Sequence, residues 1–307
     1  MVKVLVIGAN GFIGQHLVGK LLEDENLSVI GYGKQAPKNI EHIERYQFLC
    51  GDYRSESRFA DIFSQYKIDL IYHLISTTTP RSETSHAIEE LQDNVIPTIR
   101  ILQAMSQTNT KKLIFSSSGG TIYGVQNEDC RTDQPLRPIC SYGAQKVSIE
   151  AYLSVYRHTY GLDCKIARIA NPYGLTPQND RRQGIIPILI NCLMNNLPVT
   201  LYGNAIRDYI YIDEVIDALV KMQFYNGKQT VFQIGTGVAT DLHTVISMIE
   251  KICDKRFSNV NIEKERICDV HRSVLDISDT IDALAWRPRI SLEEGVLRTY
   301  QEICRNK

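Results

Sequence analysis

The opening stretch MVKVLVIGANGFIG, residues 1–14, decides the fold. A short β-branched run is followed at once by three glycines with the spacing G-x-x-G-x-x-G. Gly8 permits a tight turn, Gly11 lets the backbone approach a pyrophosphate, and Gly14 lets the next helix pack closely on the strand. The N–H groups at the start of that helix attract an anion. We therefore expect a phosphate-binding turn here, and the alternative is a plain strand-to-helix turn.

The alternation of strand-like and helix-like segments continues through the first half of the chain. Several strand candidates are apolar throughout, which is typical of central strands that are buried on both faces. The pattern predicts an α/β protein, a Rossmann fold with a doubly wound parallel sheet. The expected strands cover residues 3–7, 28–32, 46–50, 69–75, 112–116 and 164–169, and the expected helices cover residues 12–23, 57–66, 84–106 and 142–160.

After Asn171 the pattern changes to short elements that are punctuated by proline and glycine. This predicts a smaller C-terminal lobe that binds the substrate. We expect residues 1–170 to form the dinucleotide-binding domain, with later segments at about 205–235 returning to it. Residues 171–307 then form mainly the substrate-binding lobe.

Composition excludes several classes of protein. Of 307 residues, 43% are apolar and 22% are charged, and the formal net charge is -1, which argues against disorder and against nucleic-acid binding. We find no signal peptide and no apolar run of the roughly 20 residues that a membrane helix needs. The eight cysteines form no C-x-x-C pair, so we expect reduced thiols, no metal site and a cytoplasmic protein.

The segments after the second and third expected strands bear on the adenosine half of a dinucleotide. The second strand ends in Gly31-Tyr32-Gly33-Lys34, without the acid that usually binds the ribose diol. Lys34 either meets a 2′-phosphate, which favours NADP, or is an ordinary solvated lysine. Asp52 is placed to bind the adenine amino group, and Tyr53 is expected to pack beside the ring.

A serine, a tyrosine and a lysine suggest redox chemistry on an alcohol. The fifth expected strand ends in Ser116-Ser117-Ser118, and Tyr142 and Lys146 follow four residues apart. On a helix the two side chains share one face, so the ammonium is expected to lower the pKa of the phenol. The phenolate would then remove a proton from a secondary alcohol. Chance spacing on a solvated helix face is the alternative.

Motifs along nearly the whole chain resemble the extended short-chain dehydrogenase/reductase family, in particular its nucleotide-sugar epimerases and dehydratases of the UDP-hexose 4-epimerase type. The matching stretches are GANGFIG (8–14), GD (51–52), YHLIS (72–76), DNVIPT (93–98), IFSSSGGTIYG (114–124), YGAQK (142–146), RIANPYG (168–174), GNAIRDYIYIDEV (203–215), FQIGTG (232–237) and LAWRPRISLEEGV (284–296).

The resemblance implies roles for individual residues. The cofactor, NAD or NADP, would be bound by Gly8, Asn10, Gly11, Phe12, Ile13, Gly14, Lys34, Asp52, Tyr53, Leu74, Ile75, Ser76, Asn94, Ser116, Tyr142 and Lys146. The nucleotide-sugar substrate would be bound by Thr78, Arg81, Asn171, Ile186, Arg207, Arg266 and Asp269. The loop after the fifth strand is one residue longer than is usual in the family, so Ser118 and Thr121 both remain candidates for the catalytic hydroxyl, and we favour Ser118.

The residues present suffice for a nucleotide-sugar 4-epimerase, which is the function we expect. A dehydratase needs further acid–base groups, and residues 117–121 contain no carboxylate. The alternatives are a reductase of 4-keto nucleotide sugars that uses NADPH, and a non-catalytic, cofactor-sensing protein of the same fold. We expect no partner other than the small-molecule substrate and a second copy of the chain in a homodimer.

Overall fold

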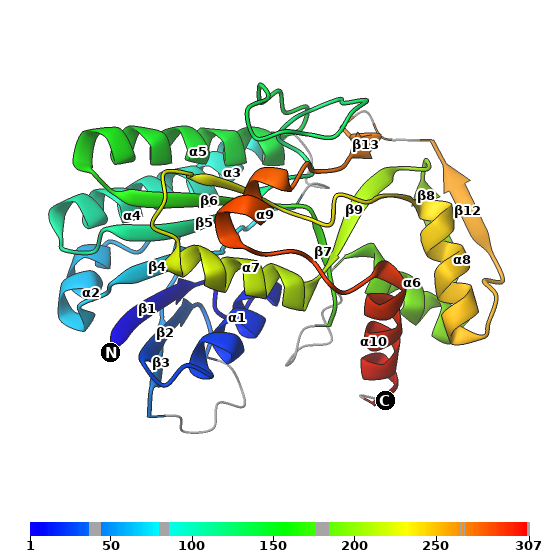
Figure 1. Cartoon of the computed structure of the whole chain (residues 1–307), viewed down its shortest axis with the longest axis horizontal. Helices are drawn as coiled ribbons and strands as arrows, with labels where there is room; N and C mark the ends of the chain where they lie inside the picture. The colour runs from blue at the N-terminus through cyan, green and yellow to red at the C-terminus, as the bar shows by residue number, and fades with distance from the viewer. Residues whose placement is uncertain (37–43, 80–85, 176–183, 265, 267, 306–307) are drawn as a thin grey trace.

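Parallel strands and their covering helices form the larger part of the chain (Figure 1). The computed structural model describes residues 1–36, 44–79, 86–175, 184–264, 266 and 268–305. Seven strands make one sheet, and each neighbouring pair in it is parallel. Their order is β10 (Val231–Ile234), β6 (Asp163–Ile169), β5 (Lys112–Ser118), β4 (Leu70–His73), β1 (Val2–Ile7), β2 (Leu27–Gly33) and β3 (Tyr46–Cys50).

Helices cover both faces of this sheet. Successive residues of each strand point to opposite sides, and the side chains on both sides are apolar, so both faces have to be buried. Val4 and Val6 pack with α1 (Phe12–Leu22) and α7 (Ile212–Phe224). Leu5 and Ile7 belong to a second core, which contains side chains of α2 (Phe59–Tyr66), α4 (Ile96–Gln107) and α5 (Ser141–Tyr160). The expected Rossmann fold is confirmed.

The segment expected to be one helix over residues 84–106 is divided into three parts, and residues 84 and 85 lie outside the described residues. It contains α3 (Ala87–Glu90), a π-helical turn η2 (Leu91–Val95) and then α4. Pro97 lies in the first turn of α4 and has no N–H to donate to the preceding turn. The π-helical turn is therefore a local adjustment just before the proline, and such turns often occur at functional sites.

Strand boundaries also differ from the expected ones in two informative places. The fourth strand ends at His73, and the chain then turns at Leu74 and Ile75 beside the first glycine turn. The fifth strand extends to Ser118, so all three serines pair with β6, with Ser117 opposite Arg168. This longer pairing fixes the directions of the serine side chains.

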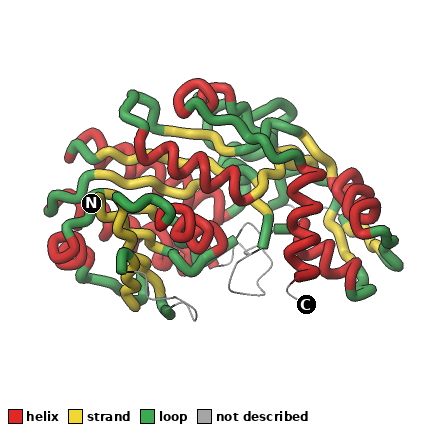
Figure 2. Tube along the Cα trace, turned by 60° about the horizontal axis from the view of Figure 1, so that its bottom comes forward, coloured by secondary structure: helices red, strands yellow, loops and turns green. Residues whose placement is uncertain are grey.

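The C-terminal lobe contains two small sheets and a group of helices (Figure 2). In the first sheet β9 (Ile206–Tyr211) pairs with β7 (Asn171–Tyr173), β11 (Ala239–Asp241) and β13 (Arg272–Ser273). In the second sheet β8 (Val199–Tyr202) pairs with β12 (Val260–Glu263). The helices of the lobe are α6 (Ile185–Met194), α8 (Leu242–Cys253) and α10 (Leu292–Arg305).

The chain passes between the sheet and the lobe more than once. After β9 it returns as α7, which packs against α1, and as β10, which is the edge strand of the large sheet. The short helix α9 (Ser278–Leu284) later packs against β10. We propose the division stated above: residues 1–170 bind the dinucleotide together with α7 and β10 of the returning segment at about 205–235, and the rest of 171–307, with β9, mainly binds the substrate.

No helix among the described residues is both long and apolar enough to cross a membrane. All eight cysteines are free thiols.

We predict that Gly14→Ala destabilises the protein by about 2 to 3 kcal/mol, the scale of overpacking in a tight core. A Cβ at this position would lie 2.1 Å from the carbonyl oxygen of Gly8, which is too close for α1 to stay in place. Urea unfolding measures the change.

Gly19→Ala, in the same helix, is the matched control. A Cβ there meets nothing within 4 Å, so the helix propensity of alanine should raise stability by about 0.5 to 1 kcal/mol. Equal effects of the two substitutions would contradict close packing at Gly14.

Candidate functional site

The turn between β1 and α1 has the shape of a phosphate cradle. Gly8 has a φ of +93°, and a Cβ there would lie 3.0 Å from the backbone nitrogen of Ile75. At Gly11 a Cβ would meet only the oxygen of Gly8, so the space beyond the turn is open. The first turn of α1 carries no acidic residue and no side-chain cap. Its N–H groups therefore remain available to an anion such as the pyrophosphate of a dinucleotide.

Asn10 lies at the tip of this turn. Its Nδ2 donates to the carbonyl oxygen of Gln35, just after β2, while its buried Oδ1 has no hydrogen-bond partner among the residues that the structure describes. Gln15 donates to the carbonyl oxygen of Asn10 across 2.9 Å. Phe12 and Ile13 are half-buried in the first turn of α1. An acceptor atom left without a partner beside an anion cradle fits a ligand that brings its own donors.

Lys34 and Asp52, just after β2 and β3, form an ion pair with each other. The Lys34 ammonium lies 3.2 Å from the Asp52 carboxylate, and Arg54 binds the same carboxylate at 2.8 Å. These cations, with the Arg54 hydrogen bonds as the main cause, hold the pKa of Asp52 well below its usual range. The carboxylate is thus ionised and can accept bonds from an amino group.

Tyr53 does not lie where it was expected, beside an adenine ring. Its side chain is 1% exposed, and its hydroxyl donates to the carbonyl oxygen of Asn94 across 2.8 Å. The same hydroxyl hydrogen-bonds with Thr98, and the ring packs on His73. The ring therefore has no open face for an adenine, because the chain turns it into the core beneath η2.

The loop after β4 lies beside the cradle and is held by Asn94. Leu74 and Ile75 approach Gly8, and Ser76 is exposed. The side chain of Asn94, in the π-helical turn, makes two hydrogen bonds with Thr77. Its Oδ1 accepts from the backbone N–H of Thr77, and its Nδ2 donates to the Thr77 hydroxyl oxygen. Asn94 thus positions the loop instead of pointing freely into the site.

The expected catalytic residues meet at the end of β5. Lys146 is 3% exposed, donates to the carbonyl oxygen of Ser116 across 2.8 Å, and lies 5.7 Å from the centre of the Tyr142 ring. Ser118 lies close enough to Tyr142 to lower the pKa of its phenol, and Thr121 donates to the Ser118 hydroxyl across 2.9 Å. Ser118 is therefore the hydroxyl next to Tyr142, and Thr121 supports it from behind.

The charge state of the pair differs from the expected one. Burial raises the pKa of Tyr142 to about 12, and only the hydrogen bond from Ser118 acts in the other direction. Burial also lowers the pKa of Lys146 to about 8, against the attraction of Glu150. The expectation that Lys146 lowers the pKa of Tyr142 is thus wrong for the protein alone, because burial of the phenol dominates and Lys146 is not among the groups that shift this pKa.

Asn171 faces the same space from the beginning of the lobe. Gly120 has open space in front of it, and the polar atoms nearest to a Cβ there would be Ser273 Oγ, Asn171 Oδ1 and Ser118 Oγ, at 3.9 to 4.0 Å. The amide of Asn171 donates to the backbone oxygen of Asp208. The side chains of the sheet and of the lobe therefore border one space beside Ser118.

Arg207 and Arg266 come from the lobe, as expected for groups that bind an anion. The Arg207 guanidinium donates to the carbonyl oxygen of His271, and Arg266 stacks on the ring of Tyr202 at 4.0 Å. Asp269 closes a turn by donating its N–H to the oxygen of Arg266. β13 pairs with β9, so the segment that follows Asp269 runs beside the strand of Arg207.

The buried carboxylate of Asp208 anchors that strand. It accepts the backbone N–H groups of Thr236 and Gly237, at 2.7 and 3.1 Å, and the Thr236 hydroxyl at 2.6 Å. Burial raises its pKa, and these donors oppose the shift. Asp208 fixes β9 to the loop that follows β10, and thereby fixes Arg207 relative to the large sheet.

The remaining expected substrate residues have different outcomes. Thr78 accepts a hydrogen bond from Gln145 of α5, so it lies beside the active-site helix. Arg81 lies outside the described residues. Ile186 is 0% exposed inside the core of the lobe, so its assignment to the substrate pocket is wrong. The apolar face of α6 points into the protein.

Sequence reasoning missed a buried network behind the catalytic pair. Glu150 accepts from Ser117 and from two nitrogens of Arg168, with 2.7 Å between Nη2 and Oε2. Arg168 in turn donates to the Tyr123 hydroxyl across 2.7 Å. The spacing of four between Lys146 and Glu150 was the available signal, since it places both on one face of α5.

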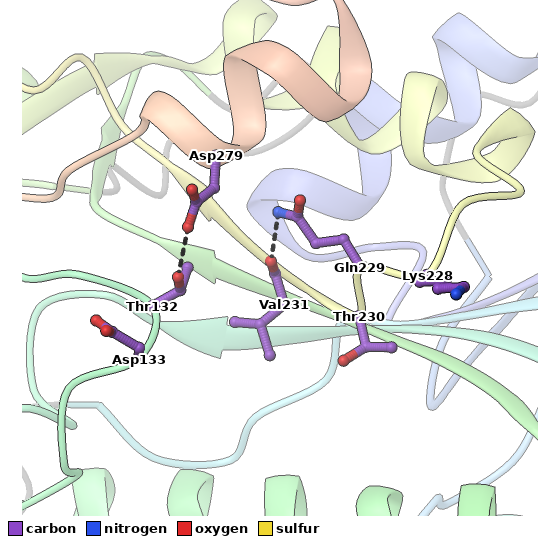
Figure 3. A pocket seen from close by; sticks show the side chains of 7 residues that line it. All are labelled: Thr132, Asp133, Lys228, Gln229, Thr230, Val231 and Asp279. Atoms are coloured by element: carbon purple, nitrogen blue, oxygen red, sulfur yellow. Dashed lines mark hydrogen bonds between the residues drawn. The ribbon is translucent and has the colours of Figure 1, made fainter.

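A hollow of about 320 Å³ lies elsewhere, near the beginning of β10 (Figure 3). Thr132 donates to Asp279 across it at 2.6 Å, and Gln229 donates to the oxygen of Val231. None of the expected site residues lines it. Within the described ranges, no cluster of three or more histidine, cysteine, aspartate or glutamate side chains could hold a metal ion.

Comparison with known proteins agrees with this geometry. Residues 4–235 match the NAD dependent epimerase/dehydratase family. The chain is 30% identical to a UDP-glucose 4-epimerase of Mycolicibacterium smegmatis, over 99% of both chains. It is 29% identical to a dTDP-4-dehydro-6-deoxyglucose reductase of Escherichia coli, over 98% of this chain and 97% of that one.

A solved structure shows the same fold. The UDP-glucose 4-epimerase of Thermotoga maritima, determined with UDP-glucose, superposes with a TM-score of 0.90 and 29% identity, over 99% of both chains.

We predict that Ser118→Ala lowers kcat about 100-fold, because it removes the hydroxyl that lies next to Tyr142 and would orient the substrate oxygen. Thr121→Val, which leaves that hydroxyl in place, should lower kcat less than about 10-fold. Steady-state kinetics with a nucleotide sugar would measure both. A larger loss in Thr121→Val than in Ser118→Ala would reverse the two roles.

Proposed function

Since the chain belongs to the NAD-dependent epimerase/dehydratase family, we propose that it is a nucleotide-sugar 4-epimerase acting on a UDP-linked hexose. The observation that carries the proposal is the cluster of Ser118, Tyr142 and Lys146 beside Asn171. Residues 117–121 contain no carboxylate, so the elimination of water that a dehydratase performs lacks its acid and base there. Removal and return of a hydride at C4 needs neither.

The cofactor is NAD, and the residues at the carboxyl edge of the sheet fit it. The glycine turn would hold the pyrophosphate, the ionised Asp52 would accept from the adenine amino group, and Lys146 would reach the nicotinamide ribose. Lys34 keeps NADP as an alternative, because its ammonium could pair with a 2′-phosphate. A dinucleotide bound there would supply the acceptor, and then the donor, of the hydride at C4 of the sugar.

The chain's own residues handle the proton and the geometry. Ser118 donates a hydrogen bond that orients the C4 oxygen. Tyr142 must first lose its own proton, and its phenolate form then takes the hydroxyl proton as the C4–H bond breaks. The 4-keto sugar then rotates within the site so that the hydride can return to its opposite face, and Tyr142 returns the proton to the same oxygen. The Lys146 ammonium stabilises the phenolate before Tyr142 takes that proton and again after Tyr142 has returned it, when the negative charge is on the phenol oxygen.

Arg207 and Arg266 are proposed to hold the diphosphate of the substrate. A guanidinium forms two parallel hydrogen bonds with phosphate oxygens, which suits a group that must stay fixed while the sugar turns. Asn171 would bind the adjoining phosphate or sugar oxygen, and Asp269 would lie beside the nucleoside. The UDP-glucose bound by the Thermotoga maritima enzyme supports a UDP sugar as the substrate class.

A reductase of 4-keto nucleotide sugars is the second candidate. The 29% identity to the Escherichia coli reductase favours it, as does Lys34 in place of a carboxylate at the end of β2. Such an enzyme would use the same Ser118, Tyr142 and Lys146 in one direction only. It must exchange its dinucleotide in every cycle.

We also propose that the protein is a cytoplasmic homodimer. Exposed apolar side chains occur on adjoining helices: Ile88, Leu91, Ile96, Tyr152 and Val155 of α3, η2, α4 and α5. A set of this kind on one side of a protein is typical of a contact with another protein surface.

We predict that Val155→Glu converts the dimer to a monomer, because a carboxylate buried in the contact would have no partner. Sedimentation velocity measures the mass. Val238→Glu is the control, since Val238 is similarly exposed but lies in the lobe, before β11. An unchanged mass for Val155→Glu would place the contact elsewhere.

The decisive test of the function follows the cofactor. For an epimerase we expect NAD to copurify, no net change at 340 nm, and retention of deuterium when C4-deuterated UDP-hexose is converted to its epimer, with Tyr142→Phe inactive. NMR identifies the product. Stoichiometric oxidation of NADPH with a 4-keto sugar, without epimer interconversion, would establish the reductase instead.

A further inference from the structure

The end of β5 contacts one face of α5 at three successive turns. Ser118 lies close enough to Tyr142 to lower the pKa of its phenol, the carbonyl oxygen of Ser116 accepts from Lys146, and Ser117 donates to Glu150. The three helix residues are four apart, so they follow one another along the helix face. The first two belong to the proposed chemistry, and the third is a buried charge that the chemistry has not used.

Glu150 is a fixed negative charge. It is 6% exposed, and three donors hold its two oxygens: Ser117 Oγ and the Nε and Nη2 atoms of Arg168. Arg168 is equally buried and is held by Tyr123 and by the carbonyl oxygen of Thr132. A carboxylate with this many donors cannot swing toward the solvent.

Lys146 lacks a carboxylate within ion-pair distance among the residues that the structure describes. Its neighbours are the Phe115 ring at 4.7 Å, the Tyr142 ring and one carbonyl oxygen. The titratable groups that face it are His73 of β4, and Tyr142 and Glu150 of α5. Glu150 is the negative charge among them at neutral pH, because burial keeps His73 and Tyr142 neutral.

We propose that Glu150 is a positioning residue that keeps Lys146 protonated at neutral pH, acting through one helical turn instead of through a direct ion pair. The pKa of Lys146 is already lowered to about 8 by burial, and Glu150 is what raises it. Without this carboxylate, the positive charge of Arg168 would remain in the protein interior and further disfavour a second cation. Lys146 would then be neutral when Tyr142 has to carry negative charge.

The inference rests on the proposed function for its consequence, but its test needs no substrate. In protein labelled with ¹³Cε-lysine, the Lys146 signal is assigned by its loss in Lys146→Arg, and its titration is followed by NMR. We expect Glu150→Gln to lower the pKa of Lys146 by about one unit or more, the scale of a nearby buried charge. Ser117→Ala keeps the carboxylate, so it should leave the titration nearly unchanged.

A paired variant separates this effect from a folding defect. Glu150→Gln leaves Arg168 without its partner, so the double variant Glu150→Gln/Arg168→Gln is measured as well, with two neutral amides that can bond each other. We expect the pKa of Lys146 to stay lowered in the double variant, and the alkaline limb of kcat to move to lower pH by the same amount. A Lys146 titration equal to that of the unsubstituted protein, in whichever of these variants folds, would overturn the proposal.

Failure of the two proposals is distinguishable. A lowered pKa of Lys146 without turnover of any nucleotide sugar supports the role of Glu150 and removes the epimerase. Turnover of a nucleotide sugar together with an unchanged titration retains the enzyme and removes the role of Glu150.

Discussion

The register of β5 between β4 and β6 is the constraint on which the site depends. Phe115 pairs with His73 on one side, and Ser117 pairs with Arg168 on the other. Side chains alternate along a strand, so a shift of one residue would turn Phe115 and Ser117 away from α5 and expose them to the opposite core. The contacts to Lys146 and Glu150 would be lost together. The neighbouring strands are buried on both faces, and their apolar packing holds this register. The same packing therefore fixes the positions of the side chains in the proposed site.

The sequence predicted what local motifs determine. The glycine turn, the six strands and the set of Ser118, Tyr142 and Lys146 are each defined within a few residues, and the strand boundaries agree to within two residues. Misplaced or missed features depend on distant packing. Tyr53 turns into the core because Asn94 and Thr98 offer partners there, and Ile186 points inward because the lobe closes around α6. Neither partner set can be recognised from spacing alone.

Burial also reversed one electrostatic expectation. The separation of Tyr142 and Lys146 by four residues suggested that the ammonium lowers the pKa of the phenol. In the structure, burial raises the pKa of Tyr142 and lowers the pKa of Lys146. Both shifts favour the neutral forms, as expected for groups taken out of water. At neutral pH Lys146 still carries its charge and Tyr142 keeps its proton, so the phenolate has to be formed for the reaction. The site is thus arranged for charge that develops during the reaction and does not store that charge beforehand.

The position of β10 has a consequence for how the chain is made. β6 is an inner strand of the finished sheet, yet its outer neighbour is formed by residues 231–234, after β7, α6, β8, β9 and α7 have been synthesised. During that interval a nascent chain that already contains the six earlier strands presents β6 as an open edge strand, which is the kind of surface that pairs with other chains. The first part of the C-terminal lobe lies between β6 and β10 in the sequence, so the ribosome must synthesise it before β10 can complete the sheet. Fragments that end shortly after residue 170 are therefore expected to aggregate, however complete their dinucleotide-binding motifs look.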